Sequence, residues 1–293
     1  MSGRLGRRHL VLVAAGGIAL LAVVETAVAL VEPALAPSDT DWQAAAAAVR
    51  AGFRPGDLIV AAPAWADPVL RQHLGDLIPA EVAARMDDDR FARVWEVSQR
   101  GGRAAAAAGG TVARDQRFGR LRVRLVEHAA ETVTYDFVAH LAEARVSRRD
   151  ARGADVACAL SGDRVSCPEG GSVPLRRQIA EVDQKLRAAV LTQPFANAAL
   201  VIEFPAVALG RSLVIATGLH DTWLRKAARG TVEARLTVGA QTAALPVTDD
   251  DSGWTRTRVD TAAQAGQTVP VRLEITSAQP RDRAFAFAAE ARR

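Results

Sequence analysis

The side chains best suited to ligand binding in this sequence gather in one short polar stretch. His220, Asp221 and Arg225 can donate and accept hydrogen bonds, and Trp223 stands among them. An indole face can stack on a sugar ring while neighbouring polar groups bind its hydroxyls. The pattern indicates a candidate glycan site, with core packing of Trp223 as the alternative. Trp254, at the start of an expected strand, is a second candidate platform with the same alternative.

Two runs of aspartates could bind a cation or form ion pairs. Asp249, Asp250 and Asp251 lie between two expected strands, and calcium prefers clusters of oxygen ligands. The later glutamate of an EF-hand loop is missing, so a solvated turn competes with a calcium site. No other cofactor is expected. For the second run, Asp87–Asp89, the arginines nearby in sequence predict local ion pairing at the end of a helix.

A third polar group, Asp67, His73 and Asp76, follows an expected buried strand. Clefts form at the carboxyl ends of strands in α/β units, and these residue types can exchange protons. No nucleophile is identified beside them, and helix capping by Asp67 with a surface position for His73 is the simpler interpretation. Catalysis, as a glycan-modifying hydrolase, is therefore kept only as an alternative.

Cys158 and Cys167 are the only cysteines and flank a turn-forming Ser-Gly-Asp sequence. The residues between them can pair as a hairpin. A zinc site needs about four ligands, and no histidine stands at ligand spacing to the pair. In an oxidising compartment the pattern predicts a structural disulfide across the hairpin.

The compartment is inferred from the N-terminus. Arginines at positions 4, 7 and 8 precede an apolar run over residues 10–31, which as a helix would measure about 33 Å and cross a membrane. The basic flank predicts a single-pass inner-membrane anchor, residues 1–32, with the remainder periplasmic. A signal peptide cleaved after residues 27–29, giving a secreted protein, is the alternative.

Glu25 interrupts this apolar run. An ionisable group near a helix end can reach the interface, or it can contact a partner helix of another membrane protein.

Charge and composition exclude one class of function. The net charge is +4 with a pI near 9.8, and the positive charge comes almost wholly from arginine. Acidic residues are interspersed throughout, so the sequence has no continuous basic stripe that would bind nucleic acid.

The elements that must position these groups fall into two regions, and the expected fold class is α+β. Alternating helices and strands over residues 39–102 predict a small parallel α/β unit without a glycine-rich phosphate loop. Its elements are a helix Gln43–Gly52 capped by Asp39 or Thr40, a strand Leu58–Ala62, helices after Pro68 and over Pro79–Met86, and a strand Phe91–Val97.

Short alternating segments separated by turns predict an antiparallel β-sandwich, jelly-roll-like, over residues 111–293. Residues 174–192 suit either a helix or a strand. The expected strands are 119–126, 132–138, 199–204, 212–217, 231–238, 255–260, 269–276 and 283–289, with 141–146 as a further extension.

Two resemblances accompany this pattern. Residues 41–60 resemble the start of the soluble extracytoplasmic region of lipid-linked-sugar glycosyltransferases. Those enzymes carry catalysis in a multi-span membrane part that this sequence lacks, so no glycosyl transfer is implied. Residues 118–293 resemble a galactose-binding-like jelly roll, through Gly218–Asp221, Ser252–Trp254 and the closing strand. That resemblance implies glycan binding or a purely structural module.

Together these features predict a non-catalytic, membrane-anchored envelope protein that recognises a glycan or a partner protein through its sandwich. A structural or assembly subunit of an envelope complex, held through Glu25 and the α/β face, is the alternative.

Overall fold

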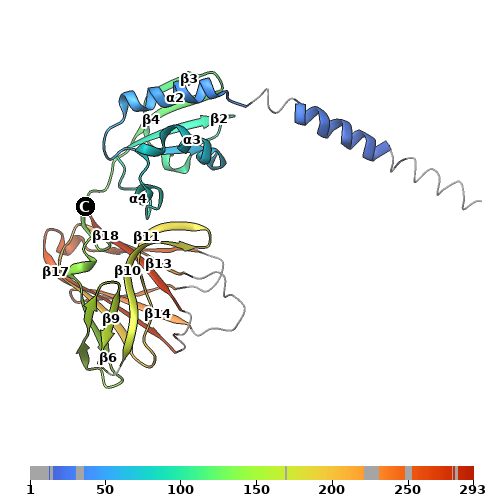
Figure 1. The fold of residues 1–293 in the computed structure, drawn as a ribbon. Helices are drawn as coiled ribbons and strands as arrows, with labels where there is room; N and C mark the ends of the chain where they lie inside the picture. Colours follow the sequence, from blue (N-terminus) through green and yellow to red (C-terminus); the bar gives the residue numbers. More distant parts are fainter. Residues whose placement is uncertain are drawn as a thin grey trace, which may run out of the picture. The chain divides into compact units, whose positions relative to one another are not determined.

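The computed structural model describes residues 13, 16–30, 36–168, 170–220, 231–247, 253–278, 280 and 283–293. The chain divides into two compact units (Figure 1). Unit 1 comprises Met1–Asp76 and Arg93–His128, and unit 2 comprises Leu77–Ala92 and Ala129–Arg293. These limits differ from the expected ranges 39–102 and 111–293, because each unit takes a segment from the other's expected range.

Unit 1 is a mixed sheet with helices, where a parallel one was expected. Its strands follow the order β1-β2-β4-β3. β1 and β2 are parallel, whereas β4 is antiparallel to both β2 and β3. The hairpin β3–β4, whose residues fall in the range expected for the sandwich, therefore completes this sheet. The strands are β1 (Leu58–Ala62), β2 (Arg93–Gln99), β3 (Thr111–Phe118) and β4 (Leu121–Glu127).

Helix α2 (Asp39–Gly52) contacts β3 and β4 (Figure 1). Its N-cap is Ser38, one residue before the expected Asp39 or Thr40. The Ser38 hydroxyl accepts from the backbone N–H of Asp41, and the Asp41 carboxylate accepts from that of Ser38. This reciprocal pair satisfies two amide groups at the helix start. At its other end, Gly52 lies against Trp95, whose indole would be 2.8 Å from an added Cβ.

Two further helices follow β1, and the second is shorter than the sequence suggests. Helix α3 spans Asp67–Leu74, with Pro68 in its first turn, and buries Leu70 and Leu74. Helix α4, expected over Pro79–Met86, is one turn at Ala80–Ala83. Residues Leu77–Ala92, which contain α4, belong to unit 2 and are called here the 77–92 segment.

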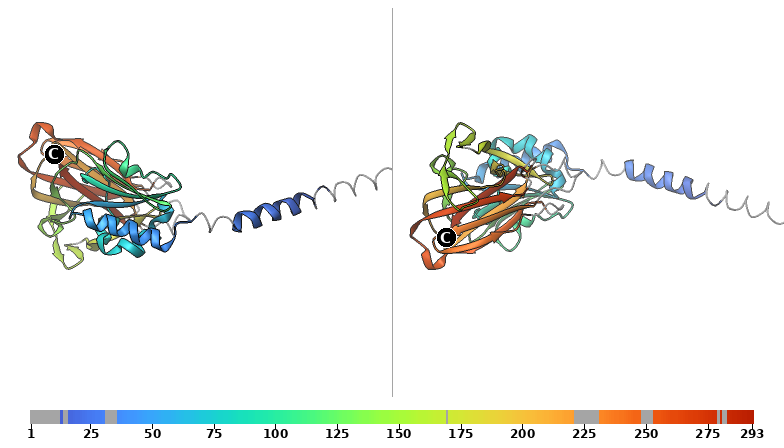
Figure 2. Two further views of the ribbon diagram at one scale, coloured as in Figure 1. Left: turned by 90° about the horizontal axis from the view of Figure 1, so that it is seen from above. Right: turned by 90° about the horizontal axis from the view of Figure 1, so that it is seen from below.

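Unit 2 contains antiparallel sheets of eight and six strands among the described residues, and Figure 2 shows them from two further directions. Their order is β16-β13-β18-β11-β10-β9-β8, with β5 beside β18, and β15-β14-β17-β12-β6-β7. The strands are β5 (Val133–Asp136), β6 (Arg145–Arg149), β7 (Asp155–Ala157), β8 (Ala159–Ser161), β9 (Arg164–Cys167), β10 (Gly171–Val182), β11 (Lys185–Thr192), β12 (Ala199–Ala208), β13 (Ser212–Leu219), β14 (Val232–Val238), β15 (Gln241–Leu245), β16 (Thr255–Asp260), β17 (Thr268–Ser277) and β18 (Phe285–Arg292).

Large side chains from both sheets form the main core, so unit 2 is a β-sandwich. Leu213 and Phe285 from one sheet share this core with Leu200 and Leu273 from the other. The eight-stranded sheet also buries its opposite face. There Ala216 and Ala288 belong to a second apolar cluster that includes Met86 of the 77–92 segment and Trp254.

The ambiguous stretch 174–192 forms the hairpin β10–β11, with Val182 opposite Lys185. Asp183 and Gln184 make the two-residue turn at φ values of 48° and 61°. Positive φ at both central residues is the geometry that tight hairpins require.

The N-terminal run is helical over residues 16–30. Among the described residues, no helix combines the length and the apolar character needed to cross a membrane. Residues 1–12, 14, 15, 31 and 32 of the expected anchor lie outside the described part of the chain.

Candidate functional site

The glycan site expected from the sequence is described only at His220. The His220 backbone N–H donates to Ala284 at 2.8 Å, and its Nδ1 lies 2.8 Å from the Glu181 carbonyl oxygen. Its expected partners Asp221, Trp223 and Arg225 lie outside the described residues, as do Asp249, Asp250 and Asp251 of the calcium candidate. Among the described residues, no group of three or more metal-ligating side chains forms a metal site.

Trp254 is a core residue. Its side chain is 8% exposed, and its indole N–H donates to the Lys185 carbonyl at 2.8 Å. The Arg187 guanidinium lies 5.3 Å from its ring centroid. A buried indole with its polar edge satisfied is the packing alternative of the sequence analysis, and it leaves no open face for a sugar.

The acid–base trio is divided among separate partners. Asp67 pairs with Arg71 of its own helix at 2.5 Å. His73 lies 3.4 Å from Asp39 and stacks on Trp42, and Asp76 accepts two hydrogen bonds from Arg50. Each side chain therefore has a structural partner outside the trio.

A pocket of about 450 Å³ opens in unit 2 where two strands separate. Strands β11 and β18 pair only as far as Val190 and Phe287. Beyond that point the Ala188 N–H donates instead to the carbonyl oxygen of Ala84 in the 77–92 segment, at 2.7 Å. This cavity, called here the sandwich pocket, therefore has sheet on one side and the 77–92 segment on the other.

The lining of the sandwich pocket combines apolar surface with opposite charges. Alanine, methionine and valine side chains supply the apolar part, and Ile179 at its edge is 41% exposed. Three guanidinium groups face three carboxylates and one amide. The polar lining residues are Arg85, Arg90, Arg177, Glu81, Asp136, Glu290 and Gln178.

Several of these polar groups are held in place by neighbours. The Asp136 carboxylate accepts from the backbone N–H groups of Val138 and Ala139, at 2.8 and 3.0 Å. Arg85 donates to Asp88 at 2.5 Å, and Arg90 donates to Glu290 at 2.9 Å. Fixed donors and acceptors of this kind orient a ligand with little loss of side-chain entropy.

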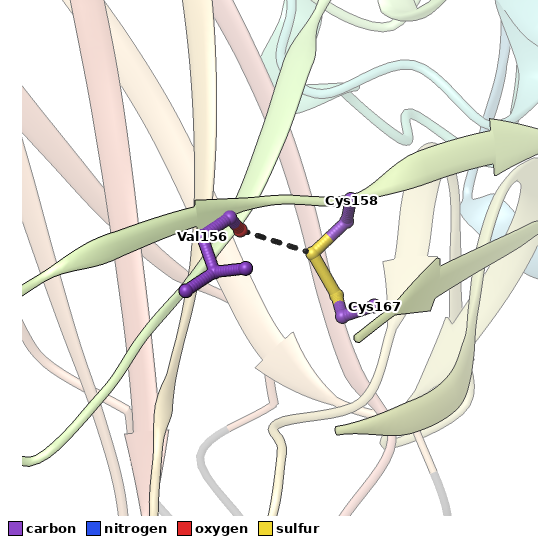
Figure 3. The surroundings of a disulfide bond; sticks show 3 residues. All are labelled: Val156, Cys158 and Cys167. Atoms are coloured by element: carbon purple, nitrogen blue, oxygen red, sulfur yellow. Dashed lines mark hydrogen bonds between the residues drawn. A yellow bond between two sulfur atoms is a disulfide. The ribbon is translucent and has the colours of Figure 1, made fainter. Parts of the chain in front are cut away.

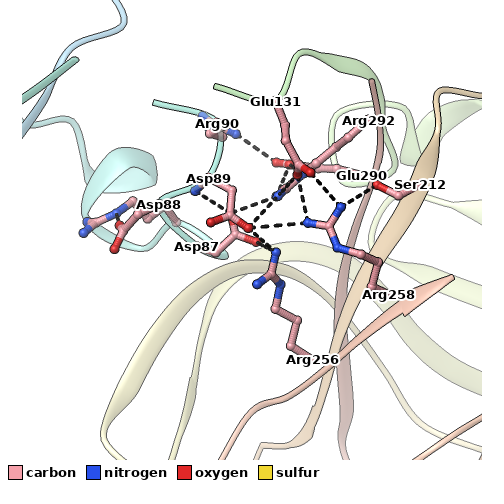
Figure 4. A network of polar contacts seen from close by, with 11 residues as sticks. Asp87, Asp88, Asp89, Arg90, Glu131, Ser212, Arg256, Arg258, Glu290 and Arg292 are labelled. Atoms are coloured by element: carbon pink, nitrogen blue, oxygen red, sulfur yellow. Dashed lines mark hydrogen bonds and ion pairs between the residues drawn. The ribbon is translucent and has the colours of Figure 1, made fainter. Parts of the chain in front are cut away.

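An ion network, buried at Arg292 and more exposed toward Arg256 and Arg258, fixes the 77–92 segment on the sheet (Figure 4). Arg292 is fully buried and binds Asp87 at 3.0 Å, Glu131 at 3.2 Å and Glu290 at 2.5 Å. Arg256 of β16 reaches both Asp87 and Asp89, at 3.0 and 2.5 Å. Of the run Asp87–Asp89, which was expected to pair with arginines nearby in sequence, Asp88 pairs with Arg85. Asp87 and Asp89 bind arginines far along the chain instead.

Glu131 is a member of this network whose pKa is shifted. Arg258 donates to its two carboxylate oxygens at 2.6 and 3.0 Å. This hydrogen bonding, together with that from Arg292, holds the pKa of Glu131 below its usual value, against the opposing effect of partial burial. The carboxylate therefore stays charged in mild acid.

Cys158 and Cys167 form a disulfide beside the hairpin β8–β9 (Figure 3). Leu160 lies opposite Val165, and Gly162 turns the chain with φ of 61°. This is the bridge expected from the spacing of the two cysteines. Such bonds persist in oxidising compartments.

The sandwich pocket was missed at the sequence level, although part of it carried a signal. Acidic and basic residues alternate closely over 81–90, and a solvated helix would explain that equally well. The cross-sheet partners of these charges lie 167 and 200 residues further along the chain.

Comparison with known proteins gives no family. No family model matches the sequence, and no curated protein matches it. Among solved structures, the carbohydrate-binding module TmCBM61, in complex with β-1,4-galactotriose, aligns with a TM-score of 0.28 and 12% identity, covering 54% of this chain and 94% of that one. A cyclase from Fischerella sp. TAU aligns with a TM-score of 0.25 and 11% identity, covering 55% and 87%.

Proposed function

We propose that this chain is a non-catalytic recognition protein of the cell envelope that binds a glycan in the sandwich pocket. The observation that carries the proposal is the composition of the lining. Three arginines and three carboxylates offset one another, and an amide and an apolar wall accompany them. A balanced lining favours a neutral ligand with many hydroxyl groups over a strongly charged one.

The size of the pocket agrees with this ligand class. Small-molecule sites usually enclose about 300–1,000 Å³ and combine an apolar surface with a few polar groups. At about 450 Å³ the sandwich pocket has room for one or two sugar rings. Their apolar faces would lie on Ile179 and Val138, which are at least partly exposed, and their hydroxyls would reach Gln178 and Arg177.

The proposed location is extracytoplasmic. The Cys158–Cys167 disulfide supports an oxidising compartment. The apolar run over residues 10–31 would anchor the chain in the inner membrane, and this part of the proposal rests on the sequence alone.

The test is a titration of the full-length chain in mild detergent with a panel of envelope glycans, with and without calcium. Gln178→Ala at the pocket is expected to weaken binding about fivefold, because a lost hydrogen bond is worth on the order of 1 kcal/mol. Gln241→Ala is the matched control, since Gln241 is an exposed glutamine of β15 outside the pocket.

A further variant, Trp223→Ala, separates the pocket from the site expected around residue 220. Binding that falls with Trp223→Ala and not with Gln178→Ala would move the site away from the sandwich pocket. No binding to any glycan of the panel would contradict the proposal altogether.

A further inference from the structure

Unit 1 has a pocket of its own, with a very different lining. It measures about 340 Å³ and lies at the carboxyl end of β2, beside the turn between β3 and β4. Among the described residues that line it are five arginines and no acid. They are Arg100, Arg103, Arg117, Arg120 and Arg122, and the cavity is called here the arginine pocket.

Two tight turns bring these arginines together. Arg100 and Gly101 end β2 with φ values of 52° and 75°, and Gly119 turns the β3–β4 hairpin with φ of 54°. Gly119 packs directly on the Asp41 carboxylate, so that an added Cβ would lie 2.0 Å from its Oδ1. The helix start and the hairpin turn are thereby held against each other, which fixes the pocket's shape.

Neighbouring acids offset only part of the positive charge. Arg122 is paired with Asp115, and Arg103 lies 3.6 Å from Glu96. Glu96 also accepts two hydrogen bonds from Arg124, which is not a lining residue. The Asp41 carboxylate accepts from the backbone N–H of Arg120 at 3.4 Å, and the side chains of Arg117 and Arg120 are both exposed. A cavity with this excess of guanidinium groups attracts anions.

We propose that the arginine pocket binds a phosphate group. Guanidinium groups match phosphate oxygens with paired, charge-assisted hydrogen bonds. The inference concerns unit 1 and does not depend on glycan binding by unit 2.

Two observations favour a lipid headgroup as the source of the phosphate. Only seven peptide steps, at most about 25 Å of extended chain, separate Leu30, the last described residue of the apolar helix, from Pro37, which lines the pocket. Trp65 is 61% exposed, and the Arg100 guanidinium lies 5.9 Å from its ring. Exposed tryptophans beside cationic groups are typical of membrane interfaces.

The experiment titrates the full-length chain in a nonionic detergent with three probes and follows binding by calorimetry. The probes are inorganic phosphate, dihexanoyl phosphatidylglycerol and, as the zwitterionic counterpart, dihexanoyl phosphatidylcholine. Binding of phosphatidylglycerol alone identifies a lipid headgroup, and equal binding of inorganic phosphate shows that the phosphate suffices. If neither binds, the proposal is overturned.

Paired variants locate the site. Arg120→Gln is expected to weaken binding about tenfold. Arg54→Gln removes the same charge from an exposed turn of the same unit outside the pocket, and is expected to leave the affinity within about twofold. Equal weakening by both variants would show a general effect of net charge and would overturn the assignment. Circular dichroism checks that both variants fold.

Discussion

At the scale of single residues, Arg292 is the centre of unit 2's ion network. Its guanidinium is fully buried among Asp87, Glu131 and Glu290. Removing one partner of a buried charge cluster leaves the others uncompensated, which usually costs about 3–5 kcal/mol. We therefore expect Arg292→Ala to lower the free energy of unfolding of unit 2 by that amount in urea denaturation.

The control for this variant is Arg235→Ala, because Arg235 is exposed on β14. Surface substitutions of this kind usually change stability by less than about 0.5 kcal/mol. Similar small losses for both variants would show that the network contributes little to the stability of unit 2.

Glu131 gives the same network a dependence on pH. Its pKa in the folded protein lies below the usual value of 4.5, chiefly through the hydrogen bonds from Arg258. A carboxyl group with a depressed folded pKa adds stability above its unfolded pKa, and that stability is lost as the pH falls through the folded pKa. Urea unfolding measured from pH 7 to pH 3 should therefore show a shallower loss for Glu131→Gln than for the parent chain.

Glu233 is the matched control for the pH series, because it is exposed on β14. Glu233→Gln is expected to leave the pH profile of stability unchanged. If the pH dependence of stability became equally shallow in both variants, the loss of stability in acid would come from overall charge and not from Glu131.

At the scale of elements, helix α2 allows a close comparison of neighbouring hydroxyls. Ser38 caps the helix through the Asp41 N–H, whereas Thr40 lies inside the first turn. Losing an N-cap side chain costs about 0.5–2 kcal/mol. Ser38→Ala should lower the stability of unit 1 by that amount and Thr40→Ala by less, measured by thermal unfolding. Equal effects would contradict the capping assignment.

Elements whose side chains alternate regularly could be predicted from the sequence. The expected strands Leu58–Ala62 and Thr255–Asp260 coincide with β1 and β16. The hairpin β10–β11 could not be resolved, because Ile179, Val182 and Leu186 also recur at helical spacing. Pairing with a neighbouring strand decided between the two, and a single sequence does not contain that information.

The candidate pockets were less predictable than the strands, for a physical reason. Arg90 and Glu290 meet across 200 residues of sequence, and charges so distant in the chain carry no common spacing. The cysteine pair, only nine residues apart, was predictable because local turn chemistry brings it together.

At the scale of the whole molecule, the chain passes three times between its two units. The 77–92 segment leaves the expected α/β region to become part of unit 2, and the hairpin β3–β4 leaves the expected sandwich to complete the sheet of unit 1. The change in periodicity near residue 110 suggests a boundary there. That boundary would separate β2 from its neighbour β4 in unit 1, and it would separate the 77–92 segment from the rest of unit 2.

This interleaving predicts how a fragment cut at that boundary behaves. A fragment 111–293 lacks Met86, which packs in the second apolar cluster, and also lacks Asp87 and Asp89, which bind Arg256. Unit 2 in that fragment should lose more than about 3 kcal/mol of stability, since apolar burial and buried ion pairing are lost together. Binding of a hydrophobic dye and urea unfolding measure the change.

Adding a synthetic peptide of residues 77–92 to the fragment should restore stability and reduce dye binding, because the peptide supplies both the apolar and the ionic contacts. A peptide carrying Asp87→Asn and Asp89→Asn keeps Met86 and loses the charges that bind Arg256. It should restore only part of the stability, and the difference between the two peptides measures the ionic share. A fragment as stable alone as in the full chain would show that the 77–92 segment merely rests on a sandwich that is already complete.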